Sequence, residues 1–209
     1  MLIAVLSFLA FAAAILAVLS AYQKRRLTHY VCKPLAVVLI ILIALQSKHP
    51  TSPFYRQAII AGLLCSLAGD IFLMLPDRFI PGLVSFLCAH VFYIAAFAYE
   101  SGGALSFWTF VPFLIYGGLM LRVLWPHLGK LKPAVLVYVA AILAMGWTAA
   151  GRRLLTEQSG SLLAFVGALL FIASDSVLAL DKFRRPFRSA QLLILLTYFA
   201  AQWLIALST

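Results

Sequence analysis

Two aspartates lie inside long apolar segments of this 209-residue chain, Asp70 in GLLCSLAGDIFLMLP (62–76) and Asp175 in GALLFIASDSVLAL (167–180). A carboxyl group is costly in apolar surroundings, so its presence there indicates a functional site. When two carboxyls share such a place, the second ionisation is disfavoured, and one keeps its proton while the other is charged. The pair then supplies an acid and a base, which suits bond cleavage through an oxocarbenium-like cation.

Four further polar residues are placed to complete such a site. Ser66 shares a helical face with the first aspartate, and Ser174 directly precedes the second. His90 and Tyr93 follow each other at helical spacing in another apolar segment, near its middle. Each has a structural alternative, because intramembrane serines commonly bond backbone or pack helices, and buried histidines and tyrosines also serve in packing.

Two lysines, Lys33 and Lys132, each stand directly before a proline near the start of an apolar segment. Both are candidates for binding an anion, although lysines at such positions also extend to lipid headgroups without further function. Two carboxyls and one histidine form a poor zinc site, which normally holds more His or Cys ligands. We therefore expect no metal and no other cofactor.

The composition is that of an integral membrane protein. Hydrophobic residues make up 65% of the chain and charged residues 11%, and the mean hydropathy is +1.06. Such a chain lacks the polar residues needed to cover a soluble globule. The net charge of +10 would suggest a nucleic-acid partner for a soluble protein, but these basic residues lie in short loops. We expect membrane lipids as partners and no nucleic acid.

Apolar runs of helical length account for nearly the whole chain, since about 20 residues cross a hydrocarbon core. The eight predicted spans are 2–22, 31–47, 57–76, 79–99, 105–125, 133–150, 160–180 and 187–207. These runs are continuous, whereas strands of a barrel would alternate polar and apolar residues. The prediction is an all-α protein with a single integral membrane domain, 1–209, whose site is built by helices.

Basic residues are distributed unequally between the two sets of loops. The first, third, fifth and seventh loops and their flanks hold twelve Lys and Arg residues. The other side holds Lys48, Arg56, Arg152 and Arg153. Because cytoplasmic loops carry the excess of positive charge, we expect both termini outside the cytoplasm, in a bacterial inner membrane.

An internal repeat relates the two aspartates, which are 105 residues apart in similar contexts. Pro81 and Pro186 have the same separation, as do Tyr93 and Tyr198. This pattern predicts two parallel halves of four helices, about 1–103 and 104–209, with functional groups between them. Both carboxyls would then lie about 9 Å inside the cytoplasmic end, at a common depth.

Taken together, these motifs closely resemble the YhhN-like family of lysoplasmalogenases. The resemblance rests on Lys33-Pro34-Leu35, Gly62-Leu63-x-x-Ser66-x-x-Gly69-Asp70, Phe79-x-x-Gly82-x-x-x-Phe86-x-x-Ala89-His90-x-x-Tyr93 and Gly167-Ala168-x-x-Phe171-x-x-Ser174-Asp175-x-x-Leu178-Ala179. It implies a lysophospholipid substrate whose vinyl ether bond is hydrolysed, with release of a fatty aldehyde and glycerophosphoethanolamine or glycerophosphocholine.

Under this resemblance, one of Asp70 and Asp175 is the general acid and the other stabilises the cation and orients water. His90 and Tyr93 complete the pocket, and Lys33 and Lys132 meet the phosphate. Three alternatives stay open: a proton-coupled transporter or lipid carrier, a hydrolase of another lysolipid ether or ester, and a non-catalytic lipid-binding scaffold. Helices broken at mid-membrane would favour transport, but the spans around the aspartates are predicted to be continuous.

Overall fold

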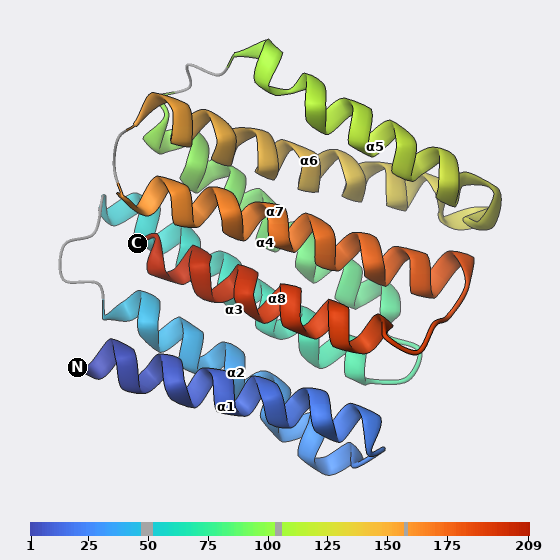
Figure 1. The fold of residues 1–209 in the computed structure, drawn as a ribbon. Helices are drawn as coiled ribbons and strands as arrows, with labels where there is room; N and C mark the ends of the chain where they lie inside the picture. The colour runs from blue at the N-terminus through green and yellow to red at the C-terminus, as the bar shows by residue number, and fades with distance from the viewer. Residues whose placement is uncertain (47–51, 103–105, 157–158) are drawn as a thin grey trace.

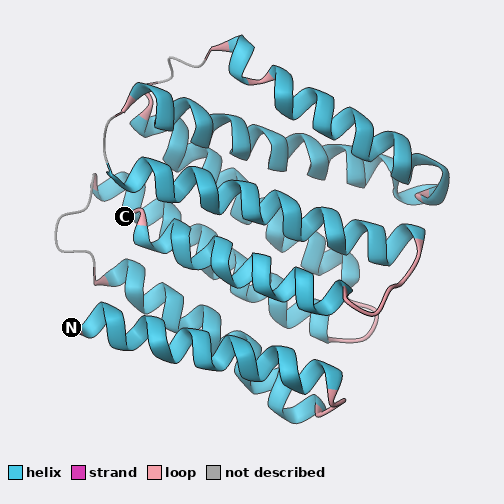
Figure 2. Ribbon diagram, in the orientation of Figure 1, coloured by secondary structure: helices cyan, strands magenta, loops and turns pink. Residues whose placement is uncertain are grey.

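The computed structural model describes residues 1–46, 52–102, 106–156 and 159–209 (Figure 1). Its long helices are α1 (Leu2–Tyr22), α2 (Arg26–Leu45), α3 (Pro53–Met74), α4 (Phe79–Glu100), α5 (Val111–Leu124), α6 (Lys132–Leu155), α7 (Ser159–Ala179) and α8 (Ala190–Leu207). Three short 3-10 turns flank α5, and a π-helical turn, Leu180–Arg184, extends α7. Helices and loops make up all of the described chain, without strands (Figure 2). The predicted all-α class is confirmed.

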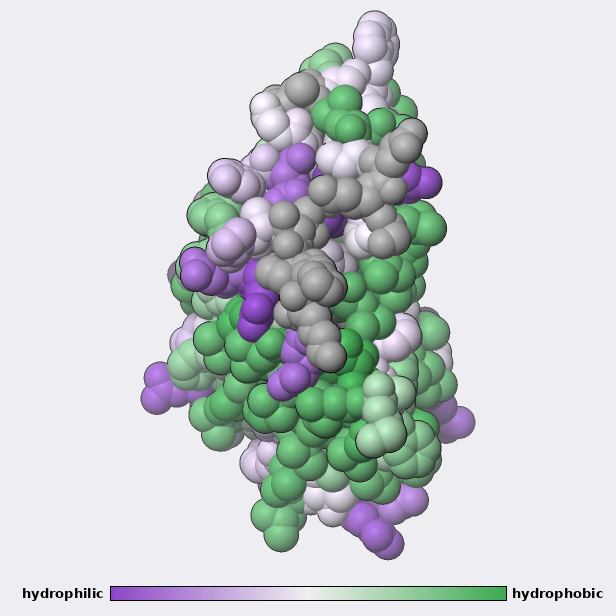
Figure 3. Space-filling model, turned by 90° about the vertical axis from the view of Figure 1, so that its left-hand side faces the viewer, coloured by the Kyte–Doolittle hydropathy of each residue, from purple (hydrophilic) through white to green (hydrophobic). Residues whose placement is uncertain are grey.

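All eight predicted spans correspond to helical segments long and apolar enough to cross a membrane. Large apolar side chains such as Phe8 and Ile115 are exposed on the outside of the bundle, as expected for lipid-facing positions. Apolar residues also cover much of the face seen in Figure 3, which looks at the end carrying the termini. The chain is an integral membrane protein.

The helices form a bundle in which sequence neighbours pair. α1 packs on α2, α3 on α4, and α7 on α8, while α8 also contacts α1, α2 and α3. α6 joins the bundle through α4 and α7, and α5 lies at its edge, mainly against α6 (Figure 1). The turns after α1, α3, α5 and α7 all lie at one end, called here the turn end; the chain termini lie at the other. The site described below opens at the turn end.

The packing has the pairing expected for two related halves. α4 contacts α6, and the corresponding helices of the other half, α8 and α2, also contact each other. Side-chain contacts differ, however: a Cβ added at Gly62 would meet Tyr93, whereas one at Gly167 would meet Ile205. The predicted boundary at 103–104 lies outside the described residues, as does Lys48. The internal repeat stays a prediction.

The end of α6 differs from the sequence prediction, and this difference places an arginine inside the bundle. α6 continues to Leu155, so Arg152, expected in a loop, lies in a helix and is fully buried. Its Nη1 donates to Tyr55 Oη at 3.0 Å, and its guanidinium carbon lies 4.3 Å from the centre of the Tyr55 ring. Tyr55 Oη also lies 2.6 Å from Ser208 Oγ. Hydrogen bonding and the aromatic face compensate the buried cation, which sequence patterning could not foresee.

Glycines bring α3 and α4 close together beside the aspartate. A Cβ at Gly62 would lie 2.3 Å from Tyr93 Cε1, and one at Gly69 would lie 2.7 Å from Phe86 Cδ2. Both rings are buried, so neither can move aside freely. The absence of a side chain at these positions lets the helix that carries Asp70 pack against its neighbour.

We expect Gly62→Ala to lower the melting temperature in detergent, because overpacking a filled core costs about 1–3 kcal/mol. Gly118→Ala is the matched control, since no atom lies within 4 Å of a Cβ at that position on α5. Alanine there stabilises a helix by about 1 kcal/mol relative to glycine. Equal melting temperatures for the two variants would contradict the close α3–α4 contact.

Candidate active site

A cavity of about 650 Å³ opens at the turn end of the bundle. It is lined by residues from α2, α3, α4, α7, α8 and the π-helical turn. Asp70 and Asp175 both line it, together with Lys33, Ser174 and Tyr198. The structure therefore brings together the two aspartates that the sequence singled out, from two different helices.

Asp70 is held in a charge-balanced network and is 1% exposed. Lys33 Nζ, from α2, lies 2.9 Å from Asp70 Oδ1, and Tyr198 Oη, from α8, donates to Asp70 Oδ2 at 2.6 Å. Charge-assisted hydrogen bonds of this kind favour the ionised carboxylate. The carboxyl group of Asp70 thus has both a cation and a hydrogen-bond donor as partners.

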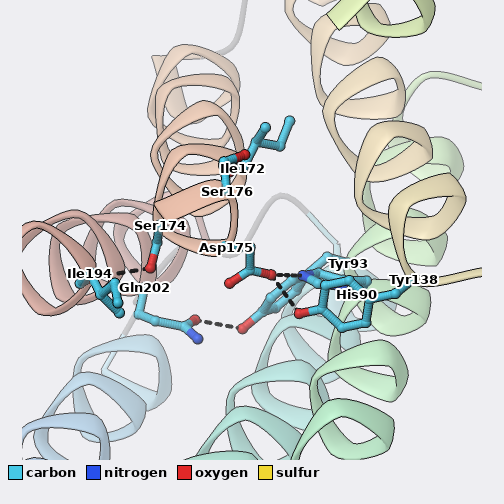
Figure 4. Close-up of polar contacts among 9 residues, drawn as sticks. All are labelled: His90, Tyr93, Tyr138, Ile172, Ser174, Asp175, Ser176, Ile194 and Gln202. Carbon is cyan, nitrogen blue, oxygen red and sulfur yellow. Dashed lines mark hydrogen bonds and ion pairs between the residues drawn. The ribbon is translucent and has the colours of Figure 1, made fainter. Parts of the chain in front are cut away.

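Asp175 has different neighbours (Figure 4). Tyr138 Oη, from α6, donates to Asp175 Oδ2 at 2.5 Å. His90 Nε2 lies 3.8 Å from the same oxygen, too far for a hydrogen bond, and the imidazole packs edge-on against Tyr138 and Phe171. Within the described residues, no Lys or Arg forms an ion pair with this carboxyl. Asp175 thus accepts a hydrogen bond from one phenol, whereas a cation and a phenol meet the other aspartate.

Basic and acidic side chains from α2 and the π-helical turn line the mouth of the cavity. Arg26 and His29 line it from one side, and Asp181 and Lys182 line it from the other. Lys182 Nζ lies 4.9 Å from the centre of the Phe79 ring, which places the π-helical turn against the start of α4. The mouth is therefore predominantly basic and offers binding groups for an anion.

The opposite wall of the site is apolar. A pocket of about 60 Å³ lies between α4, α5, α6 and α7, and Asp175, Phe79 and Leu178 line both this pocket and the polar cavity. Of these two spaces, Asp70 lines only the polar cavity. Asp175 therefore stands at a boundary between polar and apolar spaces, with Asp70 on the polar side.

The remaining predicted site residues are not all brought to the cavity. Ser174 lines it and donates to the Ile194 carbonyl at 3.1 Å. Tyr93 is buried deeper, donating to Gln202 Oε1 at 2.7 Å, with Ser66 beside it. Lys132 lies elsewhere, its Nζ 4.8 Å from the centre of the Trp125 ring. The two lysines that looked equivalent in sequence thus have different surroundings.

The sequence patterns do not identify two of the hydrogen-bond partners of the aspartates. Tyr198 stands out in the sequence only as the repeat of Tyr93, and Tyr138 belongs to none of the motifs. A tyrosine hydroxyl buried in a membrane helix needs a hydrogen-bond partner, and this is the signal that could have drawn attention to both. Which acid each one meets depends on helix packing, because the residues are 128 and 37 positions from their partners.

Comparison with known proteins places the chain among its relatives. The model of the YhhN family matches residues 28–209. The chain belongs to the YhhN family. Among its family relatives, lysoplasmalogenase TMEM86A of Bos taurus is 38% identical over 85% of this chain and 75% of its own length. The human TMEM86A lysoplasmalogenase is 37% identical over the same shares.

A bacterial branch of the YhhN family is also similar. The uncharacterized membrane protein YhhN of Escherichia coli O157:H7 is 31% identical over 92% of both chains. No solved structure matches this YhhN-family chain significantly. The family match over residues 28–209 includes the helices that carry both aspartates.

We expect Lys33→Met to lower the stability of the protein strongly. Removing one member of a buried ion pair costs about 3–5 kcal/mol, because the other charge is left uncompensated. Lys132→Met is the matched control and should have a small effect, since that lysine lies over an aromatic ring at the periphery. Thermal unfolding in detergent measures both.

Adding Asp70→Asn to Lys33→Met should recover part of the lost stability, because the uncompensated carboxylate is then gone. Equal melting temperatures for Lys33→Met and Lys132→Met would show that the Lys33–Asp70 pair contributes nothing to the fold.

Proposed function

We propose that this protein hydrolyses the vinyl ether bond of lysoplasmalogens, releasing a fatty aldehyde and a glycerophosphoethanolamine or glycerophosphocholine. The observation that carries the proposal is the unequal pair of aspartates in one cavity, with Asp175 at the boundary to an apolar pocket. Two relatives that are 37–38% identical over 85% of the chain are lysoplasmalogenases, which supports the same reaction class here.

The reaction needs an acid and then a water molecule. A proton adds to the second alkenyl carbon, and the positive charge is shared by the ether-linked carbon and its oxygen. Water attacks the ether-linked carbon and loses a proton, giving a hemiacetal. The hydroxyl group of the hemiacetal then loses a proton while the bond from its carbon to the glycerol oxygen breaks. The glycerol oxygen takes up a proton, and the aldehyde forms. One group must donate to carbon, and another must stabilise the cation and accept a proton from water.

Asp175 fits the role of the general acid. The carbon that receives the proton lies further along the hydrocarbon chain than the carbon that water attacks. The acid should therefore stand on the tail side of the bond, and Asp175 contacts the apolar pocket. A carboxyl group without a cationic partner also retains its proton more readily in an apolar wall. His90 packs beside Tyr138 and acts as a positioning residue for this carboxyl.

Asp70 fits the complementary role. Its carboxylate, kept ionised by Lys33 and Tyr198, faces the water-accessible cavity, where it can stabilise the oxocarbenium ion and orient the attacking water. Proton transfer from that water would leave Asp70 protonated and Asp175 ionised. Exchange through the open cavity restores the starting state.

The phosphate of the substrate belongs at the mouth of the cavity in this proposal. Arg26 and Lys182 line the mouth and provide two cations for it. Lys33 is already bonded to Asp70 and serves chiefly to hold that carboxylate, while Lys132 lies over Trp125. In this proposal Arg26 and Lys182 therefore bind the phosphate, in place of the two lysines expected from the sequence.

Transport is less well supported. The residues around Asp70 form the continuous helix α3, and those around Asp175 form α7, which is regular until the π-helical turn that begins at Leu180. Half-helices interrupted at the membrane midplane, which many transporters use to bind their cargo, do not occur at either acid. Assays with other lysolipid ethers and esters distinguish the proposed reaction from hydrolysis of a different lipid.

Purified protein should release aldehyde from a lysoplasmalogen, and Asp175→Asn and Asp70→Asn should each lower kcat by about 10²–10⁴-fold, the contribution of a general acid or base. Asp77→Asn is a matched control because that residue lies in the turn after α3 and does not line the main cavity. In heavy water, the aldehyde should carry one deuterium on the carbon next to the carbonyl, since that carbon receives the proton.

Full activity of both aspartate variants would overturn the assignment of roles. Aldehyde without deuterium at that carbon would exclude protonation of the alkenyl chain. Release of a fatty acid from ester lysophospholipids, with no reaction of the vinyl ether, would assign the site to a different hydrolase.

We also propose that the turn end faces the cytoplasm of a bacterial cell, because most basic residues lie there. A reporter that fluoresces only in the cytoplasm should stay dark when fused after Thr209 through a flexible linker, and should fluoresce when fused to a chain truncated after Lys130. The linker is needed because Ser208 is buried. Fluorescence of the Thr209 fusion would reverse the orientation.

A further inference from the structure

The narrow apolar pocket beside Asp175 continues toward the outside of the bundle. A second groove, of about 520 Å³, lies between α5, α6 and α7 and is lined mainly by apolar side chains. Tyr116 on α5 and Ile172 on α7 line both the pocket and the groove. The polar cavity, the narrow pocket and the apolar groove thus adjoin one another, and each shares wall residues with the next. Asp175 lies between the cavity and the pocket.

The direction and length of this path match one lipid chain. The residues of α7 that line the pocket and the groove extend from Ala179 to Phe165, and the stretch from Ser176, beside Asp175, to Phe165 runs away from the turn end. Eleven helical steps cover roughly 16 Å. That is about half of a 30 Å hydrocarbon core, or the depth of one leaflet. A lipid with its headgroup at the turn end would send its chain in this direction.

The outer wall of the path is loosely attached. α5 packs mainly on α6 and lies at the edge of the bundle (Figure 1). Its hydrogen bond to α7 runs from Tyr116 Oη to Ser176 Oγ at 2.7 Å, and Ser176 Oγ in turn donates to the Ile172 carbonyl at 2.7 Å. The bond lies beside the junction of the pocket and the groove, because Tyr116 lines both spaces.

We propose that the pocket and the groove form one hydrocarbon site, the α5–α7 channel, which binds the alkenyl chain of the substrate. The inference rests on the proposed function for the identity of the chain. The 60 Å³ pocket is the narrow part, so it admits a single unbranched chain and selects by chain shape. Tyr116 and Ser176 are positioning residues that hold α5 over the chain.

The continuity of the groove with the pocket and the polar cavity indicates what the groove binds. Lipid-facing grooves alone do not indicate a ligand, but this groove meets the wall of the pocket that contains Asp175. The polar cavity and the groove also fall within the range of about 300–1,000 Å³ that is typical of ligand sites. A chain bound there places its first carbons beside the acid and leaves the polar part of the lipid in the basic cavity.

The first measurement is photolabelling of the unmodified protein. The probe is a lysophospholipid with a saturated, uncleavable ether chain and a diazirine at the chain terminus, in detergent. We expect labelled peptides from residues 109–116 and 165–173, with competition by unlabelled long-chain lysophospholipid. Labelling confined to α1, α2 or α8 would overturn the channel, whether or not the protein hydrolyses vinyl ethers.

The second measurement is chain-length selectivity in hydrolysis. Ala173→Trp, at the groove, should lower kcat/KM for a long-chain lysoplasmalogen by about tenfold or more, and leave a short-chain analogue that ends within the pocket nearly unchanged. Leu162→Trp, on an exposed part of α7 outside the groove, is the matched control and should leave both rates unchanged. Equal losses for long and short chains in Ala173→Trp would overturn the proposal.

The two measurements separate the possible failures. Labelling of α5 and α7 without hydrolysis of any vinyl ether would keep the hydrocarbon site and remove the proposed reaction. Hydrolysis that responds to both aspartates, together with labelling elsewhere, would keep the reaction and remove the channel.

Discussion

The structure depends on compensating two carboxyl groups inside an apolar bundle, and it does so in two different ways. Asp70 takes an ammonium from α2 and a phenol from α8, while Asp175 takes a phenol from α6 and has an imidazole nearby. These contacts also fasten α2 and α8 to α3, and α6 to α7. Removing a partner would leave a buried polar group unsatisfied, so the bonds that define the acids also hold the bundle together.

Because the two carboxyl groups have different partners, the site is polar around Asp70 and partly apolar around Asp175. Cations line the polar cavity, and the apolar walls of the pocket lie on the other side of Asp175. The proposed substrate, a lysoplasmalogen, has the same order of headgroup, ether bond and tail. The site therefore need not extract its substrate from the membrane, because the polarity of the cavity follows the polarity of the lipid layer around it.

Much of this arrangement was predictable from the sequence. Spans of continuous apolar residues predicted the eight helices, and the two acids in those spans predicted two carboxyls that line one cavity. Both predictions were possible because hydrophobicity and helical period are local properties. Tyr138, the placement of Lys132 and the burial of Arg152 were not predictable in the same way. Each depends on which helices meet and on how far α6 extends, which apolar patterning alone does not determine. Similar sequence around Lys33 and Lys132 did not lead to similar contacts, since only one of these lysines faces a buried acid.

The buried Arg152, at the end of the bundle that carries the chain termini, limits how the helices can move. Arg152 and Tyr55 tie α6 to α3, and the bond from Tyr55 to Ser208 adds the residue that follows α8, all far from the cavity mouth. α3 and α8 are also bonded at the cavity, where Tyr198 donates to Asp70, so these two helices are fastened at both ends. Their separation is therefore fixed beside the site as well as at the end that carries the termini.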